Sequence, residues 1–185
     1  MTSAAAQKIS IGRPDTLHIV QGQMSVSGDP DVRICTLLGS CVSACIRDPI
    51  ARIGGANHFL LPDRRESMST LSYGVHAMEL LINELLCRGA RKDRLEAKLF
   101  GGGRMVRGLS DIGSQNAEFA QRFLTNEGIS HIGGSLGGVQ ARRIEFWPYS
   151  GRVRQQLIEA GDVFETETKK APPAPVEDAG ALELF

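Results

Sequence analysis

Two alternating apolar runs on either side of an Asp-Pro pair constrain the fold more than any other feature of this sequence. The runs cover residues 34–47 and 53–61, and Asp48 and Pro49 stand between them. Alternation with a period of two is typical of a strand, and Asp followed by Pro suits the first two positions of a type I turn. The stretch therefore predicts a β-hairpin.

The predicted hairpin brings a thiol and an imidazole together. A turn over residues 48–51 sets Cys41 directly opposite His58, and opposed residues have Cβ atoms roughly 4.5 to 5.5 Å apart. A nearby imidazolium lowers the pKa of a thiol from about 8.5, which yields a thiolate nucleophile near neutral pH. Two alternatives stay open: both side chains pack in a core, or a turn one residue longer or shorter sets Cys41 against Asn57 or Phe59.

The two faces of the predicted hairpin differ, and one of them is made of small side chains. In the register above, this face carries Cys41, Ser43, Cys45, Gly54, Ala56 and His58. Gly39 and Ser40 precede the thiol, and backbone amides there can donate to a developing oxyanion, a contribution of roughly 3 kcal/mol per donor in enzymes. The alternative is an ordinary bulge or the start of a strand.

Several separated motifs resemble one protein family. They read LGSCVSACIRDP at 38–49, GGANHFLLP at 54–62, LEAKLFGGG at 95–103, IGSQN at 112–116 and GG-x-x-AR-x-x-EF at 137–146. In this order they resemble the CheD family, chemoreceptor glutamine deamidases of bacterial chemotaxis, over about residues 11 to 163. The resemblance implies a two-sheet β-sandwich flanked by helices, with Cys41 and His58 as the catalytic pair.

The third member of the implied site is open. The resemblance places a catalytic Thr six residues before the Cys, and Cys35 occupies that position here. Thr36 follows it, but neighbours in an extended strand point to opposite faces. Thr36 completes the site if a bulge turns it toward His58, and otherwise Cys35 or another group orients the imidazole.

The resemblance also implies a substrate, the cytoplasmic domains of methyl-accepting chemoreceptors, and a deamidation that requires no metal or cofactor. Two other functions stay open. The chain could be a binding module for a CheC-like phosphatase with little catalysis of its own. It could also be a cysteine hydrolase that acts on a different amide.

The same cysteines raise the question of zinc. Cys35, Cys41, Cys45 and His58 form a Cys3His set on paper, but their spacing lacks the C-x2-C pair that structural zinc sites favour. Nothing marks the chain as secreted, and cytosolic thiols are kept reduced. We therefore predict free thiols and no metal.

Length and charge fit a single cytoplasmic domain. The 185 residues suit one core, and 21 basic residues balance 21 acidic ones, so bulk charge gives no case for nucleic acid or an anionic membrane. No apolar run reaches the length of a membrane span, and no signal peptide is evident. We expect a flexible N-terminus at 1–8, the deamidase domain at 9–164 and a disordered tail at 165–185.

The remaining pattern predicts an α+β domain, a two-sheet β-sandwich core flanked by helices. Apolar residues at helical spacing predict helices at 73–87 and 114–127, the second with Ser114 as N-cap and Gly128 after its end. Further strands are expected at 16–21, 95–100, 129–132, 142–147 and 152–158, with glycine-rich loops at 101–103 and 133–138.

Overall fold

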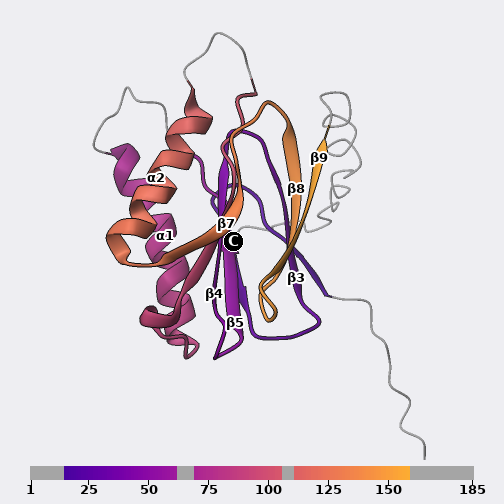
Figure 1. Ribbon diagram of the computed structural model, residues 1–185, viewed down its shortest axis with the longest axis vertical. Helices are drawn as coiled ribbons and strands as arrows, with labels where there is room; N and C mark the ends of the chain where they lie inside the picture. Colours follow the sequence, from indigo (N-terminus) through magenta and orange to yellow (C-terminus); the bar gives the residue numbers. More distant parts are fainter. Residues whose placement is uncertain (1–14, 62–68, 106–110, 159–185) are drawn as a thin grey trace, which may run out of the picture.

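Two β-sheets packed face to face form the core of the structure, a computed structural model that describes residues 15–61, 69–105 and 111–158 (Figure 1). The four-stranded sheet has the order β1-β3-β8-β9, and the five-stranded sheet has the order β2-β5-β4-β6-β7. The strands are β1 (Thr16–His18), β2 (Met24–Ser27), β3 (Arg33–Leu38), β4 (Val42–Asp48), β5 (Ile53–Asn57), β6 (Glu96–Gly101), β7 (Ser130–Leu136), β8 (Ala141–Trp147) and β9 (Arg152–Ile158).

Helices α1 (Ser69–Cys87) and α2 (Ile112–Glu127) cover the outer face of the five-stranded sheet, and a short 3-10 helix, η1 (Lys92–Arg94), precedes β6 (Figure 1). The predicted α+β sandwich with helices outside is confirmed. Among the described residues, neither helix has the length and apolar character that a membrane crossing requires. The predicted flexible N-terminus at 1–8 and disordered tail at 165–185 lie outside the described residues.

The two faces of β4 serve two different apolar layers. Val42, Ala44 and Ile46 pack under the helices, whereas Cys45 packs between the sheets with residues of β3 and β8. Side chains that alternate along a strand point to opposite faces. The predicted division of the hairpin into two faces is therefore correct, and Cys41 belongs to the side that faces the other sheet.

The predicted hairpin register is wrong by two residues. Asp48 pairs with Ile53, so the loop between β4 and β5 holds four residues instead of two. His58 consequently no longer lies directly opposite Cys41. A shift of two residues keeps every side chain on its face, so both side chains still point to the same side of the sheet.

The side chain of Asp48 explains the longer loop. Its Oδ1 accepts hydrogen bonds from the N–H groups of Ile50 (2.9 Å) and Ala51 (3.0 Å), and the N–H of Arg52 donates to the Asp48 carbonyl oxygen at 2.9 Å. Arg52 takes a left-handed conformation with φ of 56°, which turns the chain into β5.

Replacing Asp48 with Ala is expected to lower the free energy of unfolding by roughly 3 to 5 kcal/mol, since it removes a buried charge with several donors. Besides the loop amides, Asp48 accepts from the Arg91 N–H at 2.9 Å and pairs with Arg94 at 2.6 Å. Urea unfolding checks the result. Asp93→Ala, which breaks an exposed pair with Arg91, should unfold near the parent midpoint, and equal midpoints for both variants would contradict the prediction.

The run 34–47, predicted as one strand, is divided between the two sheets. β3 belongs to the four-stranded sheet and β4 to the five-stranded sheet, and Gly39, Ser40 and Cys41 form the connection. Residues before the connection therefore face residues after it across the space between the sheets. This change of sheet decides which side chains meet at the site.

Smaller differences concern the ends of elements and one additional strand. Asp111, not Ser114, is the N-cap of α2, because its carboxylate accepts from the Ser114 N–H at 3.1 Å. Gly128 ends the helix with φ of 68°, as predicted. β7 continues through Gly133 and Gly134, where a loop was predicted, and β2 was not predicted at all.

Candidate active site

One open pocket, of about 380 Å³, brings the predicted site residues together between the ends of the two sheets. Its lining comprises Ile19, Val20, Gln21, Thr36, Leu37, Gly39, Cys41, His58, Met105 and Ala141. The predicted trio of Cys41, His58 and Thr36 thus lines a single cavity. The trio comes from the connection after β3, the segment after β5 and β3 itself.

A hydrogen bond of 2.8 Å joins Thr36 Oγ1 to Nδ1 of His58, and both side chains are buried. Thr36 also donates its hydroxyl proton to the carbonyl oxygen of Ile19, at 2.8 Å. A hydroxyl has one proton to donate, so Oγ1 accepts from Nδ1–H of His58. This network assigns the tautomer in which Nε2 carries the free lone pair.

Nε2 of His58 is buried and has no hydrogen-bond partner among the described residues. An unpaired buried polar atom is costly, so it calls for a reason. The pocket offers one, because His58 lines the same cavity as Cys41 and the lone pair of Nε2 is not taken by any other described group.

Of the two residues left open, Thr36 and not Cys35 contacts the imidazole of His58. Thr36 contacts His58, whereas Cys35 pairs with Glu145 and lies on the outer face of the four-stranded sheet, away from the inward-facing Ile34. The alternation along β3 is regular, so no bulge is involved. Thr36 reaches His58 because the chain changes sheets between them.

Thr36→Val is expected to lower the catalytic rate by roughly 10²-fold, because it removes the acceptor that fixes the tautomer and orientation of His58. Thr36→Ser, which keeps the hydroxyl, should recover most of the rate. Cys35→Ser should stay near the parent rate. Steady-state kinetics of the three variants check this, and a larger loss in Cys35→Ser than in Thr36→Val would reverse the assignment.

Burial keeps the thiol and the imidazole uncharged in the resting pocket. It raises the pKa of the Cys41 thiol above its ordinary value, although the backbone N–H of Cys41 itself lowers it. Burial likewise lowers the pKa of His58 from 6.5 to about 4, and the Ile19 carbonyl only partly opposes this. The sequence predicts a thiolate beside an imidazolium. The structure instead favours an uncharged thiol and a neutral imidazole.

The low pKa of His58 predicts a loss of stability in mild acid. Between pH 6.5 and about 4 the unfolded chain binds a proton at His58 and the folded protein does not. Stability from the neutral ring is therefore complete above pH 6.5 and falls as the pH drops toward 4, by roughly 3 kcal/mol in total. Urea unfolding across this range should show a smaller loss in His58→Gln, whereas His76→Gln, which changes an exposed His on α1, should follow the parent. Equal losses in parent and His58→Gln would contradict it.

The backbone at Cys41 is held from outside the pocket. The N–H groups of Gly102 and Gly103 donate at 2.8 Å to the carbonyl oxygens of Cys41 and Gly39. A Cβ on Gly101, with φ of 109°, would clash with the Cys41 carbonyl oxygen. The glycine-rich loop predicted at 101–103 therefore supports the connection between the sheets with its amides.

Asn116 ties the two sides of the site to α2. Its Nδ2 donates to the Ser40 carbonyl oxygen at 2.9 Å, and its Oδ1 accepts from the Leu61 N–H at 2.8 Å. The side chain is fully buried. The sequence shows Asn116 only as part of the motif IGSQN and indicates no role for it. In the folded chain Asn116 holds the segments around Cys41 and His58.

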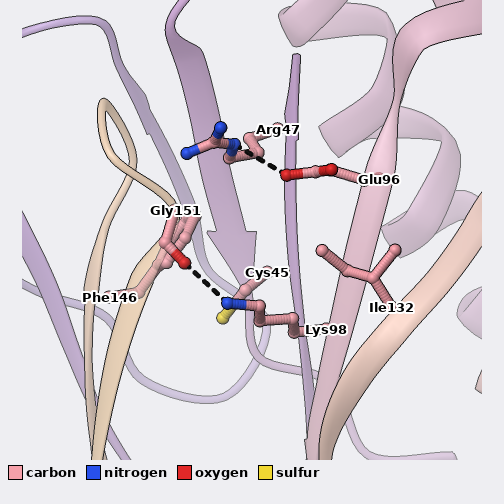
Figure 2. Close-up of a pocket in the computed structure, with 7 residues that line it drawn as sticks. All are labelled: Cys45, Arg47, Glu96, Lys98, Ile132, Phe146 and Gly151. Atoms are coloured by element: carbon pink, nitrogen blue, oxygen red, sulfur yellow. Dashed lines mark hydrogen bonds and ion pairs between the residues drawn. The ribbon is translucent and has the colours of Figure 1, made fainter. Parts of the chain in front are cut away.

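Cys45 lies in the middle of β4, and its surroundings differ from those of Cys41. Figure 2 shows it beside Lys98, whose Nζ donates to the Gly151 carbonyl oxygen at 2.9 Å and so links the two sheets. Burial raises the pKa of Cys45 to about 12, although the Ser43 hydroxyl and Lys98 oppose the shift. Cys45 is thus an unreactive core residue.

The four residues considered as a zinc set, Cys35, Cys41, Cys45 and His58, do not converge. Cys41 and His58 line the pocket, whereas the buried Cys35 is on the other face of β3 and does not line it. All four cysteines are free. In the part of the chain that the structure describes, no group of three or more His, Cys, Asp or Glu side chains is placed to hold a metal ion.

The fold and pocket together define an α+β protein with the side chains that a cysteine hydrolase requires: a thiol, a buried imidazole base and a hydroxyl that orients it. Comparison with known proteins gives the particular family. A family model described as CheD chemotactic sensory transduction matches residues 60–157. The chain belongs to the CheD family.

Curated relatives match nearly the whole chain. A protein of Caulobacter sp. (strain K31) is 55% identical over 174 residues, which cover 91% of this chain and 92% of the relative. A protein of Caulobacter vibrioides (strain NA1000 / CB15N) is 51% identical, and the match covers 91% of this chain and 92% of the relative. A protein of Acidiphilium cryptum (strain JF-5) is 50% identical, and the match covers 100% of both chains. All three are named probable chemoreceptor glutamine deamidase CheD.

Proposed function

We propose that this chain is a protein-glutamine deamidase that converts specific glutamine side chains of methyl-accepting chemoreceptors to glutamate and releases ammonia. One observation carries the proposal: Cys41, His58 and Thr36 converge in one pocket, with the Thr36 contact of 2.8 Å leaving Nε2 of His58 free as a base. The names of the relatives, at 50% to 55% identity over most of the chain, support the substrate.

In the proposed reaction Nε2 of His58 takes the proton of Cys41 as Sγ attacks the carboxamide carbon of the receptor glutamine. Backbone N–H groups at Gly39 and Ser40 donate to the oxyanion. His58 then gives its proton to the leaving nitrogen, the C–N bond breaks, and ammonia departs from a thioester. A water molecule activated by His58 hydrolyses the thioester to glutamate and restores the thiol. No step calls for a metal or a cofactor.

We place the reaction in the cytoplasm, on the cytoplasmic domains of the receptors, where the reduced state of Cys41 is maintained. A new glutamate carboxylate is a group that a methyltransferase can esterify, which joins the reaction to receptor methylation. A CheC-like phosphatase is a second possible partner, and the alternative function of the chain is a docking module for it.

The test is incubation of the purified protein with a chemoreceptor cytoplasmic fragment in water enriched in oxygen-18. Peptide mass spectrometry should find individual glutamines converted to glutamate, each with one solvent oxygen, together with an equal amount of ammonia. Binding of the fragment or of a CheC-like phosphatase without conversion would contradict the deamidase and favour the docking module. Conversion of unrelated small amides alone would favour a different amidase.

A further inference from the structure

Gln21 is a pocket residue that neither the sequence motifs nor the proposed mechanism uses. Its Oε1 lies 3.9 Å from Sγ of Cys41, within range of a hydrogen bond donated by a thiol. The Cys41 thiol is the one partner that its carboxamide has among the described residues, and the side chain is exposed on the pocket side. A carboxamide therefore stands at the atom that attacks the substrate.

The backbone holds Gln21 in a defined place. The N–H of Gln23 donates to the Val20 carbonyl oxygen at 2.9 Å, and Gly22 has φ of 84°, as the third position of a type II turn requires. This turn is clamped to the imidazole residue, because Gly22 donates to the His58 carbonyl oxygen at 2.8 Å and the His58 N–H donates to Gln23 at 2.9 Å. Gln21 and His58 are thus positioned by one unit.

The reaction changes whether the carboxamide of Gln21 must accept or donate a hydrogen bond. In the resting state the neutral thiol donates, so the oxygen of the carboxamide faces it. Once the proton has passed to His58, sulfur and the developing oxyanion are acceptors only. Rotation about the last side-chain bond of Gln, which is soft, exchanges the oxygen for the Nε2 donors.

We propose that Gln21 is a catalytic residue that donates a side-chain hydrogen bond from Nε2 to the oxyanion of the tetrahedral intermediate, beside the backbone donors at Gly39 and Ser40. This inference rests on the proposed function. In the step concerned, the bond from Sγ to the carboxamide carbon forms, the carbonyl π electrons move to oxygen, and the Cys41 proton goes to His58. Gln21 neither gains nor loses an atom.

Two rates separate this role from a merely structural one. Amide turnover passes through an oxyanion, whereas alkylation of Cys41 by iodoacetamide requires the thiol but forms no oxyanion. Gln21→Ala should therefore lower kcat on receptor fragments by roughly 10²-fold, with little change in KM, while the alkylation rate and the thermal unfolding temperature stay near those of the parent. A parallel fall in both rates, or no fall in kcat, would overturn the proposal.

Two further variants sharpen the test. Gln21→Glu keeps the size and the acceptor but removes the N–H donors, so it should lose at least as much activity as Gln21→Ala, and an active Gln21→Glu would contradict donation. The control is Gln121→Ala, which changes an exposed Gln on α2 that does not line the pocket and should keep a kcat near that of the parent. Peptide mapping of the incubated parent that finds glutamate at position 21 would show a substrate in place of a donor and would also overturn the proposal.

A readout independent of receptor turnover keeps the two proposals distinguishable. A glutamine-like peptide whose carboxamide is replaced by an aldehyde adds to Cys41 and places a tetrahedral oxygen where the oxyanion forms. The concentration that protects Cys41 from iodoacetamide should rise about tenfold in Gln21→Ala, the effect of one neutral hydrogen bond. Equal protection in both proteins would refute the Gln21 donor, while a parent that binds the aldehyde but leaves receptor glutamines unchanged would refute only the proposed substrate.

Discussion

Cys41→Ala is expected to lower the rate of glutamine conversion by roughly 10⁴-fold or more, because removal of a covalent nucleophile leaves only binding and oxyanion stabilisation. Cys41 is the one thiol that lines the pocket with His58. It is partly buried, and among the described residues its thiol bonds only to Gln21, so the variant should fold like the parent. Site-resolved mass spectrometry of a receptor fragment measures the rate.

Cys87→Ala provides the matched control for this experiment. Cys87 is a free, exposed thiol at the end of α1, on the far side of the five-stranded sheet from the pocket. Its replacement should leave the rate unchanged. Conversion by Cys41→Ala at the parent rate, or an equal loss in both variants, would show that the nucleophile has been assigned wrongly.

His58→Gln is expected to lower the rate by roughly 10³-fold or more, since a Gln amide can keep a hydrogen bond to Thr36 but cannot take the thiol proton. The raised pKa of Cys41 makes the base necessary near neutral pH. The residual rate of the variant should increase as the pH is raised and the thiol ionises without help. The parent should show no comparable increase.

His76→Gln is the control for the second prediction. His76 lies exposed on α1 and is not part of the pocket lining. The pH-rate profiles of the parent, His58→Gln and His76→Gln test whether His58 acts as the base. A His58→Gln variant with the parent profile would remove His58 from the reaction, whatever its contact with Thr36.

The parts of the fold that depend on local pattern could be predicted from the sequence. The helical spacing near Met78 places α1, and the period of two in the hairpin assigns Cys41 and His58 to one side of the sheet. The pairing register could not be predicted, because it depends on how the carboxylate of Asp48 binds the loop amides. Because the error in the register was two residues, each side chain was still assigned to the correct face of the sheet.

The third site residue required the folded chain. Thr36 and Cys41 look like members of one strand, and the sequence gives only the small residues Gly39 and Ser40 as a sign that the chain changes sheets. Once β3 and β4 belong to facing sheets, the rule that neighbours point to opposite faces no longer separates Thr36 from His58.

Gln21 and Asn116 illustrate a different limit. Each acts on the site through contacts between segments distant in sequence: a turn before β2 bonded to His58, and a helix residue bonded to Ser40 and Leu61. Periodicity describes single elements and carries no information on such contacts. Only the IGSQN motif gave a sequence signal for Asn116, and no motif included Gln21.

The central claim is that the Cys41 sulfur attacks a receptor glutamine, and covalent capture tests it most directly. A receptor peptide with the target glutamine replaced by 6-diazo-5-oxonorleucine presents an electrophilic carbon where the carboxamide would lie. Peptide mapping should find a single adduct on Cys41, formed slowly in His58→Gln and absent after prior alkylation of Cys41. An adduct on Cys35, Cys45 or Cys87, or no adduct on a protein that converts the natural receptor, would contradict the account.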